Sequence, residues 1–215
     1  MTTALIPVKN LEDSKSRLLS RLPDGLRRRL TLAMLEDLIE ALTATPGIER
    51  IAVTTPDETV TAHARAAGAE VLLRPEPGLN AALEDGRARL CADDGDLLFV
   101  LGDVAGALAS DFAHLLETAA GEAPGVWLAP SADGGTSALL HHPAGLIPCC
   151  FGPDSAKRHG EAAAAAGVPL IELALPSLAI DLDHPEDLDA FLETEGGGVR
   201  TRALLLEAAD GDDDV

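Results

Sequence analysis

The chain opens with the sequence ALIPV at residues 4–8, followed by KNLEDSKSRL at residues 9–18. The apolar run predicts a buried strand, and the loop behind it carries the cations Lys9, Lys15 and Arg17 ahead of a helix start. Because ligands of α/β folds bind where strands end in loops, we expect this loop to bind phosphate groups. Two of the three lysines of the chain lie here, which favours positions that need a compact ammonium group. A surface loop that simply carries charges is the alternative.

Apolar, strand-like runs alternate with helical stretches along the whole chain, which predicts a mainly parallel sheet flanked by helices. The length of 215 residues fits a single α/β domain. The expected strands are residues 3–8, 50–54, 69–73, 97–101, 125–129, 137–142, 169–174 and 179–182. The expected helices are residues 24–44, 58–67, 78–90, 111–120, 156–166, 184–192 and 200–209, with Ser110 and Ser155 as N-caps of the fourth and fifth.

Composition excludes several classes of protein. The formal net charge of −20 argues against nucleic-acid binding, which needs a basic surface to neutralise phosphates. No apolar stretch approaches the roughly 20 residues of a membrane helix, and the start lacks a basic secretory signal, so we expect a cytoplasmic protein without membrane contact. Cys91, Cys149 and Cys150 are too few and too badly spaced for a disulfide framework or a zinc site, and we expect them to be small buried hydrophobes.

Carboxylates follow two of the expected strands. Asp103 comes after LFVLG at residues 98–102, a position suited to a Mg²⁺ ion that bridges substrate phosphates; a turn cap is the alternative. Asp181 and Asp183 are two residues apart in an extended segment and therefore share a face, where a cation would relieve their repulsion. Asp183 also fits an N-cap before His184-Pro185, which makes Asp181 the preferred partner of Asp103 on a metal.

Two glycine-rich turns form a further candidate site. The first is DGGTS at residues 133–137, and the second is FGPDSAKRH at residues 151–159. The second turn leads into the N-terminus of a helix, where backbone N–H groups are free for a small anion and Lys157 lies one turn inside. A capped helix facing solvent explains any one of these residues equally well. Together they favour a pocket for a phosphorylated acid.

These residues resemble the guanylyltransferases of deazaflavin coenzyme F420 biosynthesis, the 2-phospho-L-lactate or phosphoenolpyruvate guanylyltransferases. The resemblance spans residues 4–192 in the family's order. The matching elements are residues 6–9 with 14–18, GLNAAL at 78–83, Asp103, GGT at 134–136, Phe151-Gly152 with Ser155 and His159, and DLDHPEDL at 181–188. The chain departs from the family at Val104-Ala105, where Leu-Pro is usual, and at Ser137, where Asn is usual.

The resemblance implies a single-domain, three-layer α/β nucleotidyltransferase of the glycosyltransferase-A-like kind, with a Rossmann-like, mixed and mainly parallel sheet over residues 1–195. Residues 196–215 would then hold a short helix and an acidic tail that we expect to be disordered. The implied reaction is a Mg²⁺-dependent transfer of GMP from GTP to phosphoenolpyruvate or 2-phospho-L-lactate. Together with the loop cations and Lys157, the contacts that we expect fall into three groups: Pro7, Val8, Lys9, Lys15, Arg17, Leu79 and Asn80 for the nucleotide, Asp103, Asp181 and Asp183 for metal, and Thr136, Gly152, Ser155 and Lys157 for the acid.

The catalytic role falls to Lys9, Lys15 and Arg17, which would offset the phosphate charge together with the metal. Two alternatives stay open at this point. One is another nucleotidyltransferase, such as a molybdenum-cofactor guanylyl- or cytidylyltransferase, although the opening loop lacks the glycine-rich turn of those enzymes. The other is a catalytically silent nucleotide-binding protein. The acceptor acid is also open, as is assembly into a homodimer.

Overall fold

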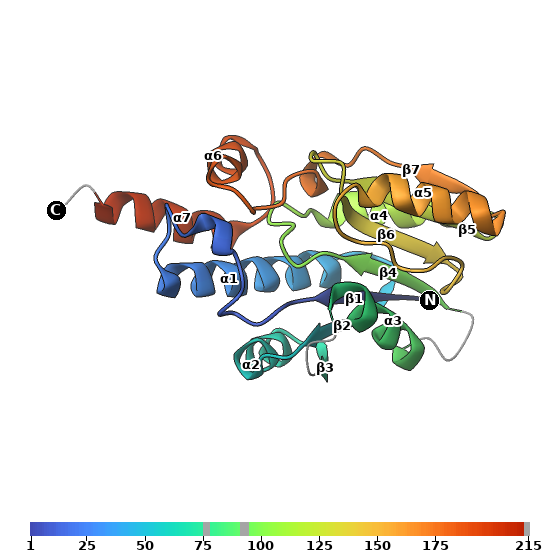
Figure 1. Ribbon diagram of the computed structural model, residues 1–215, viewed down its shortest axis with the longest axis horizontal. Coiled ribbons are helices and arrows are strands. Elements are labelled where there is room, and N and C mark those ends of the chain that lie inside the picture. The colour runs from blue at the N-terminus through green and yellow to red at the C-terminus, as the bar shows by residue number, and fades with distance from the viewer. Residues whose placement is uncertain (75–77, 91–94, 213–215) are drawn as a thin grey trace.

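The computed structural model describes residues 1–74, 78–90 and 95–212, with side chains up to residue 209. The described chain forms three layers, with a seven-stranded sheet between two layers of helices (Figure 1). The strands are β1 (Thr2–Pro7), β2 (Ile48–Thr55), β3 (Glu70–Leu73), β4 (Asp96–Val100), β5 (Gly125–Pro130), β6 (Thr136–His142) and β7 (Leu170–Glu172). The helices are α1 (Asp24–Thr43), α2 (Glu58–Ala66), α3 (Leu79–Leu90), α4 (Ala109–Ala119), α5 (Ser155–Ala166), α6 (Pro185–Glu193) and α7 (Val199–Asp212), with short 3₁₀ turns η1 (Ser16–Leu18) and η2 (Pro176–Leu178).

The sheet has the strand order β3-β2-β1-β4-β6-β5-β7, and β6 alone runs antiparallel to its neighbours. From β1 the chain winds outward through β2 to β3 and then returns to β4 on the other side of β1. The winding direction therefore reverses between β1 and β4. In such sheets the crevice at the carboxyl ends of these two strands is the usual place for a ligand.

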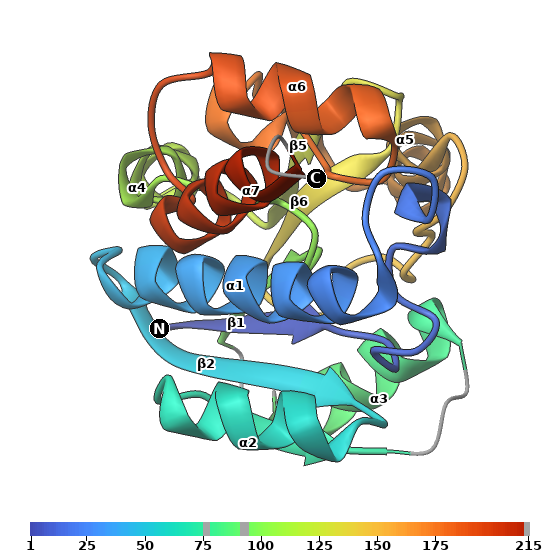
Figure 2. The same ribbon diagram turned by 90° about the vertical axis from the view of Figure 1, so that its left-hand side faces the viewer.

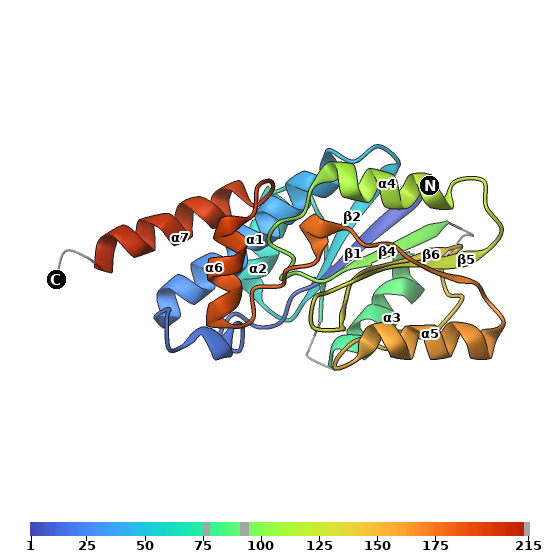
Figure 3. The same cartoon turned by 90° about the horizontal axis from the view of Figure 1, so that it is seen from above.

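Helices cover both faces of the sheet. This explains why the central strands are apolar along their length and do not alternate between apolar and polar residues. Ile6 packs with α1, α2 and α4 on one face, whereas Leu5 packs with α3 and α5 on the other (Figure 3). Gly86 lets α3 approach closely, because a Cβ at this position would lie 2.6 Å from Leu5 Cδ2. Strand β1 is thus buried between two layers of helices, and Gly86 allows the layer with α3 to lie close to it.

A third apolar cluster connects the two ends of the chain. It joins Leu18 of η1 and Met34 of α1 to Phe191 of α6 and Leu204 of α7. The helix α7 lies along α1 with α6 beside it (Figure 2), and Asp37 of α1 accepts hydrogen bonds from both the backbone N–H (2.9 Å) and the hydroxyl (2.8 Å) of Thr201. The C-terminal helix is therefore packed against the body of the protein.

Seven of the eight expected strands form, but the strand expected at residues 179–182 does not. Pro176 instead begins η2, and the segment then crosses the strand ends, where Asp181 makes a single isolated bridge with Val104. The last helix begins at Val199 and continues to Asp212, past the expected end at residue 209 and into the run expected to be disordered; residues 213–215 lie outside the described residues.

The two predicted N-caps were also wrong. Leu108 precedes α4, which begins one residue before Ser110, and Asp154 precedes α5, so that Ser155 is the first helical residue. The prediction for the cysteines holds for Cys149, which is buried, whereas Cys150 is half-buried and Cys91 lies outside the described residues. Within the described ranges, each helix is too short or too polar to cross a membrane.

Candidate functional site

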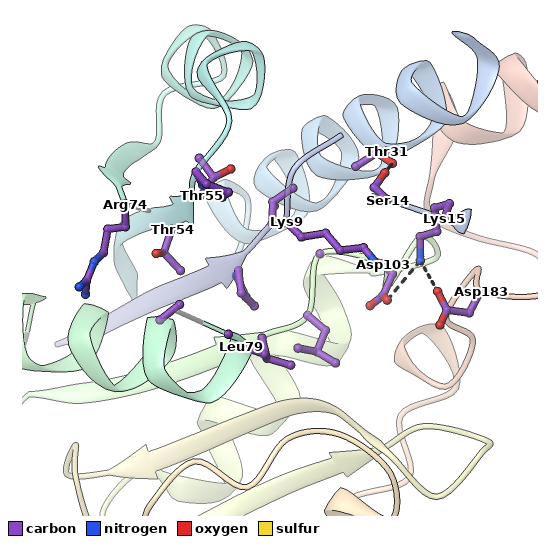
Figure 4. Close-up of a pocket in the computed structure, with 17 residues that line it drawn as sticks. Lys9, Ser14, Lys15, Thr31, Thr54, Thr55, Arg74, Leu79, Asp103 and Asp183 are labelled. Atoms are coloured by element: carbon purple, nitrogen blue, oxygen red, sulfur yellow. Dashed lines mark hydrogen bonds and ion pairs between the residues drawn. The ribbon is translucent and has the colours of Figure 1, made fainter. Parts of the chain in front are cut away.

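A pocket of about 350 Å³ lies at the carboxyl ends of β1, β2 and β4, at the reversal point of the sheet (Figure 4). The predicted residues Pro7, Val8, Lys9, Lys15 and Leu79 line it. The other lining residues are Ser14, Thr31, Thr54, Thr55, Pro56, Arg74, Gly78, Ala82, Leu101, Gly102, Asp103 and Asp183. A volume of this size is within the range of small-molecule sites. The pocket therefore joins the opening loop, the start of α3 and two of the predicted carboxylates.

Gly102 sets the spacing at the floor of the pocket. A Cβ at this position would lie 3.0 Å from the carbonyl oxygen of Pro7 and 3.2 Å from Val8 Cγ2. The end of β4 can approach the end of β1 only because residue 102 has no side chain. Asp103, the next residue, is thereby brought beside the opening loop.

The three predicted metal ligands meet at the edge of this pocket. Oxygen atoms of Asp103, Asp181 and Asp183 all lie within 4.8 Å of one another. The backbone holds them together, because Leu182 N–H donates to the carbonyl oxygen of Asp103 (3.3 Å) and Asp181 pairs with Val104. Asp103 Oδ1 is buried and has no hydrogen-bond partner among the described residues. Three oxygen ligands at this spacing can hold a divalent cation.

The electrostatics of the cluster differ from one carboxylate to the next. Burial raises the pKa of Asp181 to about 6, with the charges of Asp103 and Asp133 adding to the effect. Burial also acts to raise the pKa of Asp183, but the Lys15 ammonium outweighs it and the net pKa is lowered. The α6 cap is His184, so Asp183 is free of the capping role that its sequence position also allowed. Its carboxylate faces Lys15 instead.

Lys15 lies between the carboxylates. Its ammonium nitrogen Nζ is 2.9 Å from Asp183 Oδ1 and 3.2 Å from Asp103 Oδ2 (Figure 4). The side chain is only 6% exposed; burial on its own lowers the pKa of Lys15, but the two carboxylates outweigh burial and raise it, so the group stays charged. Its backbone adopts a left-handed conformation with φ of 52°, an uncommon state for a residue with a side chain. Lys15 was predicted to bind phosphate directly, and in the structure its ammonium group is already ion-paired with two carboxylates.

The other two predicted cations lie further out. Lys9 lines the pocket and is close enough to Asp183 to help lower the pKa of that carboxyl. Arg17 is 64% exposed and its Nη1 is 3.2 Å from Asp183 Oδ2, at the rim rather than among the lining residues. The three cations of the opening loop therefore differ in position: Lys15 is buried, Lys9 lines the pocket and Arg17 lies at its rim.

Asp57 holds the opening loop in place, a role that the sequence analysis missed. Its Oδ1 accepts hydrogen bonds from the N–H groups of Thr59 and Val60 and so caps α2, while its Oδ2 accepts one from Leu11 N–H (3.1 Å). Burial alone would raise the pKa of Asp57, but these three donors outweigh it and the pKa is lowered. The capping position was readable before a helix, whereas the contact across 46 residues was not.

The predicted acid-binding residues Thr136 and Ser155 lie together but are buried, each 1% exposed. The Ser155 hydroxyl donates to Thr136 Oγ1 (3.0 Å), and Thr136 Oγ1 is 3.1 Å from His159 Nδ1. Neither hydroxyl is among the residues lining the pocket. This region is a compact hydrogen-bonded group on β6 and α5, next to the turn that contains Gly152.

Asn80, which the resemblance places near the nucleotide, is bonded to the backbone of the turn at Phe151. Its amide oxygen accepts from Phe151 N–H (2.8 Å) and its amide nitrogen donates to the Phe151 carbonyl (3.0 Å), so both ends are engaged by the backbone of the turn. One helical turn later, Glu84 Oε1 accepts from Cys149 N–H (2.7 Å). Helix α3 therefore touches the pocket through Leu79 and holds the turn at residues 149–151 through Asn80 and Glu84.

Lys157 does not join the predicted acid site. Its side chain is 78% exposed and its ammonium is 3.8 Å from Glu161 on the next turn of α5. The neighbouring Arg158 is the opposite case: its Nε and Nη2 atoms are buried without a hydrogen-bond partner in the described part of the chain. Arg158 Nη2 lies against Gly152, where a Cβ would be 3.0 Å from it.

The mixed sheet, the pocket at its reversal point and the carboxylate cluster define a nucleotidyltransferase-like α/β fold. The structure is similar to that of a Desulfovibrio desulfuricans G20 protein classed with the nucleotide-diphospho-sugar transferases, with a TM-score of 0.80 and 16% identity, covering 97% of this chain and 95% of the other. It is also similar to 4-diphosphocytidyl-2C-methyl-D-erythritol synthase, with a TM-score of 0.60 and 16% identity over 95% of this chain and 97% of the other. At these identities the likeness is one of fold.

The chain belongs to the CofC-like guanylyl transferase family, whose model matches residues 2–207. It is 43% identical to the phosphoenolpyruvate guanylyltransferase of Rubrobacter xylanophilus, over 90% of this chain and 94% of that protein. It is 40% identical to the phosphoenolpyruvate guanylyltransferase of Nocardia farcinica, over 95% of this chain and 90% of that one. These matches confirm the family that the motifs indicated.

Proposed function

We propose that the protein transfers GMP from GTP to phosphoenolpyruvate and releases pyrophosphate. The observation that carries this proposal is the meeting of Lys9, Lys15 and three carboxylates at the pocket where the sheet reverses. A phosphate oxygen of the acid attacks the α-phosphorus of GTP, a new P–O bond forms, and the bond to the β-phosphate oxygen breaks. The attacking phosphate is already ionised at neutral pH, so the reaction calls for positioning and charge neutralisation rather than a strong base.

GTP is assigned to the pocket of about 350 Å³. Pro7, Val8 and Leu79 supply its apolar and backbone contacts, and Lys9 faces the phosphates from the opening loop. Arg17 at the rim adds charge to the outer phosphates. Asn80 acts through the turn at Phe151 rather than by direct contact with the base, because both ends of its amide are already bonded.

Asp103, Asp181 and Asp183 are assigned to Mg²⁺. The fit rests on an all-oxygen donor set, on the unpartnered Asp103 Oδ1, and on the burial and neighbouring negative charges that raise the pKa of Asp181 to about 6. When bound, the ion supplies positive charge to the phosphates of GTP. Lys15 orients two of these carboxylates, Asp103 and Asp183, through its ammonium group and lowers the pKa of Asp183.

The acid is assigned to Thr136, Gly152 and Ser155, with Arg158 in place of Lys157 as the cation. Arg158 carries buried guanidinium nitrogens without a partner among the described residues, and a guanidinium suits the carboxylate or phosphate of such an acid. Lys157 points away and is paired with Glu161. This assignment moves the positive charge by one residue along α5.

The broader predictions are part of the same proposal. They are a place in coenzyme F420 biosynthesis, a cytoplasmic location and a surface that does not bind nucleic acid. The acidic net charge of −20 supports the last of these. Assembly into a homodimer stays a prediction, and 2-phospho-L-lactate stays the alternative acceptor.

Product analysis tests the function directly. The purified protein is incubated with GTP and Mg²⁺ and, in separate reactions, with phosphoenolpyruvate, 2-phospho-L-lactate or 3-phosphoglycerate. We expect pyrophosphate release and a guanylylated phosphoenolpyruvate by mass spectrometry. A guanylylated product of another acid would overturn the acceptor but keep the reaction. Activity with CTP in place of GTP would favour a cytidylyltransferase, and GTP binding without pyrophosphate would favour a catalytically silent protein.

A further inference from the structure

A chain of hydrogen bonds runs through the buried centre of the predicted acid site. It begins at the backbone N–H of Cys150, which is 2.9 Å from His159 Nε2, and continues from His159 Nδ1 to Thr136 Oγ1 at 3.1 Å. It ends at the Ser155 hydroxyl, 3.0 Å from Thr136 Oγ1. His159 is fully buried, and both hydroxyls are 1% exposed. The groups of this hydrogen-bond chain are therefore largely shielded from bulk water.

The first bond decides the direction of the second. A backbone N–H can only donate, so His159 Nε2 must accept with its lone pair. A neutral imidazole carries one proton, which therefore resides on Nδ1 and is donated to Thr136 Oγ1. Burial, followed by the charge of Arg158, lowers the pKa of His159 to about 4, so the ring is neutral near pH 7. The tautomer is thus fixed by the fold.

The hydroxyl pair then has one proton more than it can use internally. Thr136 Oγ1 accepts from His159, and the single contact between the two hydroxyls uses one of their two O–H groups. Ser155 donates in that contact, so the Thr136 hydroxyl keeps its own proton for an external acceptor. Within the described residues, no further acceptor contacts either hydroxyl oxygen.

We propose that His159 is a positioning residue that orients the Thr136–Ser155 pair, so that one hydroxyl proton is always directed to an oxygen of the anionic acceptor. The inference rests on the proposed function and assigns this donor to an oxyanion of the phosphorylated acid. In the opposite tautomer, with the proton on Nε2, the lone pair of His159 Nδ1 would face Thr136. Thr136 would then donate to His159 and Ser155 to Thr136, which leaves neither hydroxyl proton for the acid. The neutral His159 ring thus keeps one hydroxyl of the pair available as a hydrogen-bond donor and adds no charge to the site.

The surroundings hold His159 in this orientation. The Phe151 ring packs edge-on against the imidazole, with a centroid distance of 4.9 Å and an interplanar angle of 74°. Asn80 fixes the Phe151 backbone and Glu84 fixes Cys149 N–H, so the turn that carries Cys150 N–H is held on both sides. The side chains of helices α3 and α5 together keep the three successive N–H groups of residues 149–151 bonded.

Spectroscopy tests the hydrogen-bond direction without any ligand. The protein is labelled with ¹⁵N at its histidine rings, and the His159 signals are assigned by their loss in His159→Asn. We expect a protonated Nδ1 and an unprotonated Nε2 at pH 7. A protonated Nε2 would overturn the proposal, because the Cys150 N–H could not then donate to it.

Binding of phosphoenolpyruvate, measured calorimetrically with Mg²⁺ present, tests the role. His159→Leu keeps the bulk of the ring but removes the donor, and we expect Kd to rise about tenfold, as for a lost hydrogen bond to an anion, with GTP affinity within twofold of wild type. His159→Asn places an amide close to the position of Nδ1 and should recover most of the affinity, while melting curves show whether each variant folds.

The outcomes separate this inference from the proposed function. Equal phosphoenolpyruvate affinity in wild type, His159→Leu and His159→Asn would overturn the positioning role even if the enzyme forms product. Weakening for both variants alike, or an equal loss of GTP affinity, would indicate a purely structural role and would also overturn it. Wild-type protein that binds phosphoenolpyruvate but forms no guanylylated product would sink the proposed reaction while the rescue pattern still decides the inference.

Discussion

The two candidate binding regions are stabilised in different ways. Around the opening loop, Lys15 and Arg17 face Asp103 and Asp183, so the geometry is held by opposite charges. Around His159, neutral groups hold one another through directed hydrogen bonds. A cluster of carboxylates can bind one cation in place of another while its side chains keep their positions. A chain of directed hydrogen bonds, by contrast, keeps a single arrangement of donors and acceptors. The first region therefore suits a metal and a polyphosphate, and the second suits selection of one small acid.

Removal of a carboxylate from the charged region should have the largest effect. Asp103→Asn keeps the shape but removes a proposed metal ligand and one partner of Lys15, and kcat/KM for GTP should fall on the order of a hundredfold or more. Steady-state pyrophosphate release measures this. Asp189→Asn is the matched control, because Asp189 is 62% exposed in a surface pair with Arg21 and its loss should leave the rate unchanged. A fall of less than fivefold for Asp103→Asn would remove the metal role.

Replacement of the buried ammonium should have the next largest effect. Lys15→Ala leaves Asp103 and Asp183 facing each other, so turnover should fall on the order of tenfold to a hundredfold. Because the ammonium no longer competes for these carboxylates, added Mg²⁺ should raise the melting temperature of the variant more than that of wild type. Arg28→Ala, which breaks an exposed pair with Glu12 in the same loop, should change neither quantity. Equal Mg²⁺ responses in wild type and Lys15→Ala would show that the metal binds elsewhere.

Two neighbouring cations of α5, Arg158 and Lys157, should differ in their effect on the second region. Arg158→Ala should raise the KM for phosphoenolpyruvate about tenfold, the effect expected for one charge-assisted hydrogen bond, and leave the KM for GTP within twofold. Lys157→Ala should leave both constants unchanged, because that side chain is 78% exposed and paired with Glu161. The reverse pattern would restore Lys157 as the cation of the acid site.

The pH dependence of stability provides the smallest and most local test. The pKa of His159 is lowered from 6.5 to about 4 by burial and by Arg158, and that of His141 is lowered to about 4 by burial and by His159. As pH falls from 6.5 to 4, the unfolded chain takes up protons that the folded protein refuses, so the free energy of unfolding decreases. In His159→Asn, the proton uptake on unfolding near pH 5 should drop by about one proton.

Urea titrations between pH 4 and pH 7 measure this difference. Asp181 acts in the opposite direction, because its pKa is raised to about 6 and the folded protein binds the extra proton as pH falls. Comparison of wild type with His159→Asn cancels that contribution, since Asp181 is present in both. Identical slopes for the two proteins would mean that His159 titrates normally in the folded state.

The charged region could be predicted from the sequence, because strand ends of a parallel sheet meet at one edge. That rule placed the opening loop near Asp103, and the spacing of Asp181 and Asp183 placed both on one face. The apolar run at residues 179–182 misled in detail, since its alternation resembles a strand while Pro176 turns the chain across the sheet. Charge and burial pattern were sufficient for the position of the cluster.

The sequence grouped Thr136, Gly152 and Ser155 in one region, but the hydrogen bonds of this neutral region could not be predicted because they join residues far apart in the chain. Asn80 reaches the Phe151 backbone across 71 residues, and His159 reaches Thr136 across 23. The roles of Lys157 and Arg158 depend on which side of α5 faces the turn, and the alanine-rich sequence of that helix carries too weak a pattern to decide it. The sequence therefore pointed to Lys157, which is exposed, and not to the half-buried Arg158.

The cluster that joins Leu18 to Leu204 has a consequence for the order of events during synthesis. Most of its members come from η1, α1, α6 and α7, so the apolar contacts that anchor the opening loop include residues near the end of the described chain. The sheet strands β1 to β6 can pair while the ribosome is still adding the later helices. The loop with Lys15, by contrast, reaches its final support only after residue 205 has emerged from the ribosome. A nascent chain would then carry a nearly finished sheet before it carries a finished candidate site.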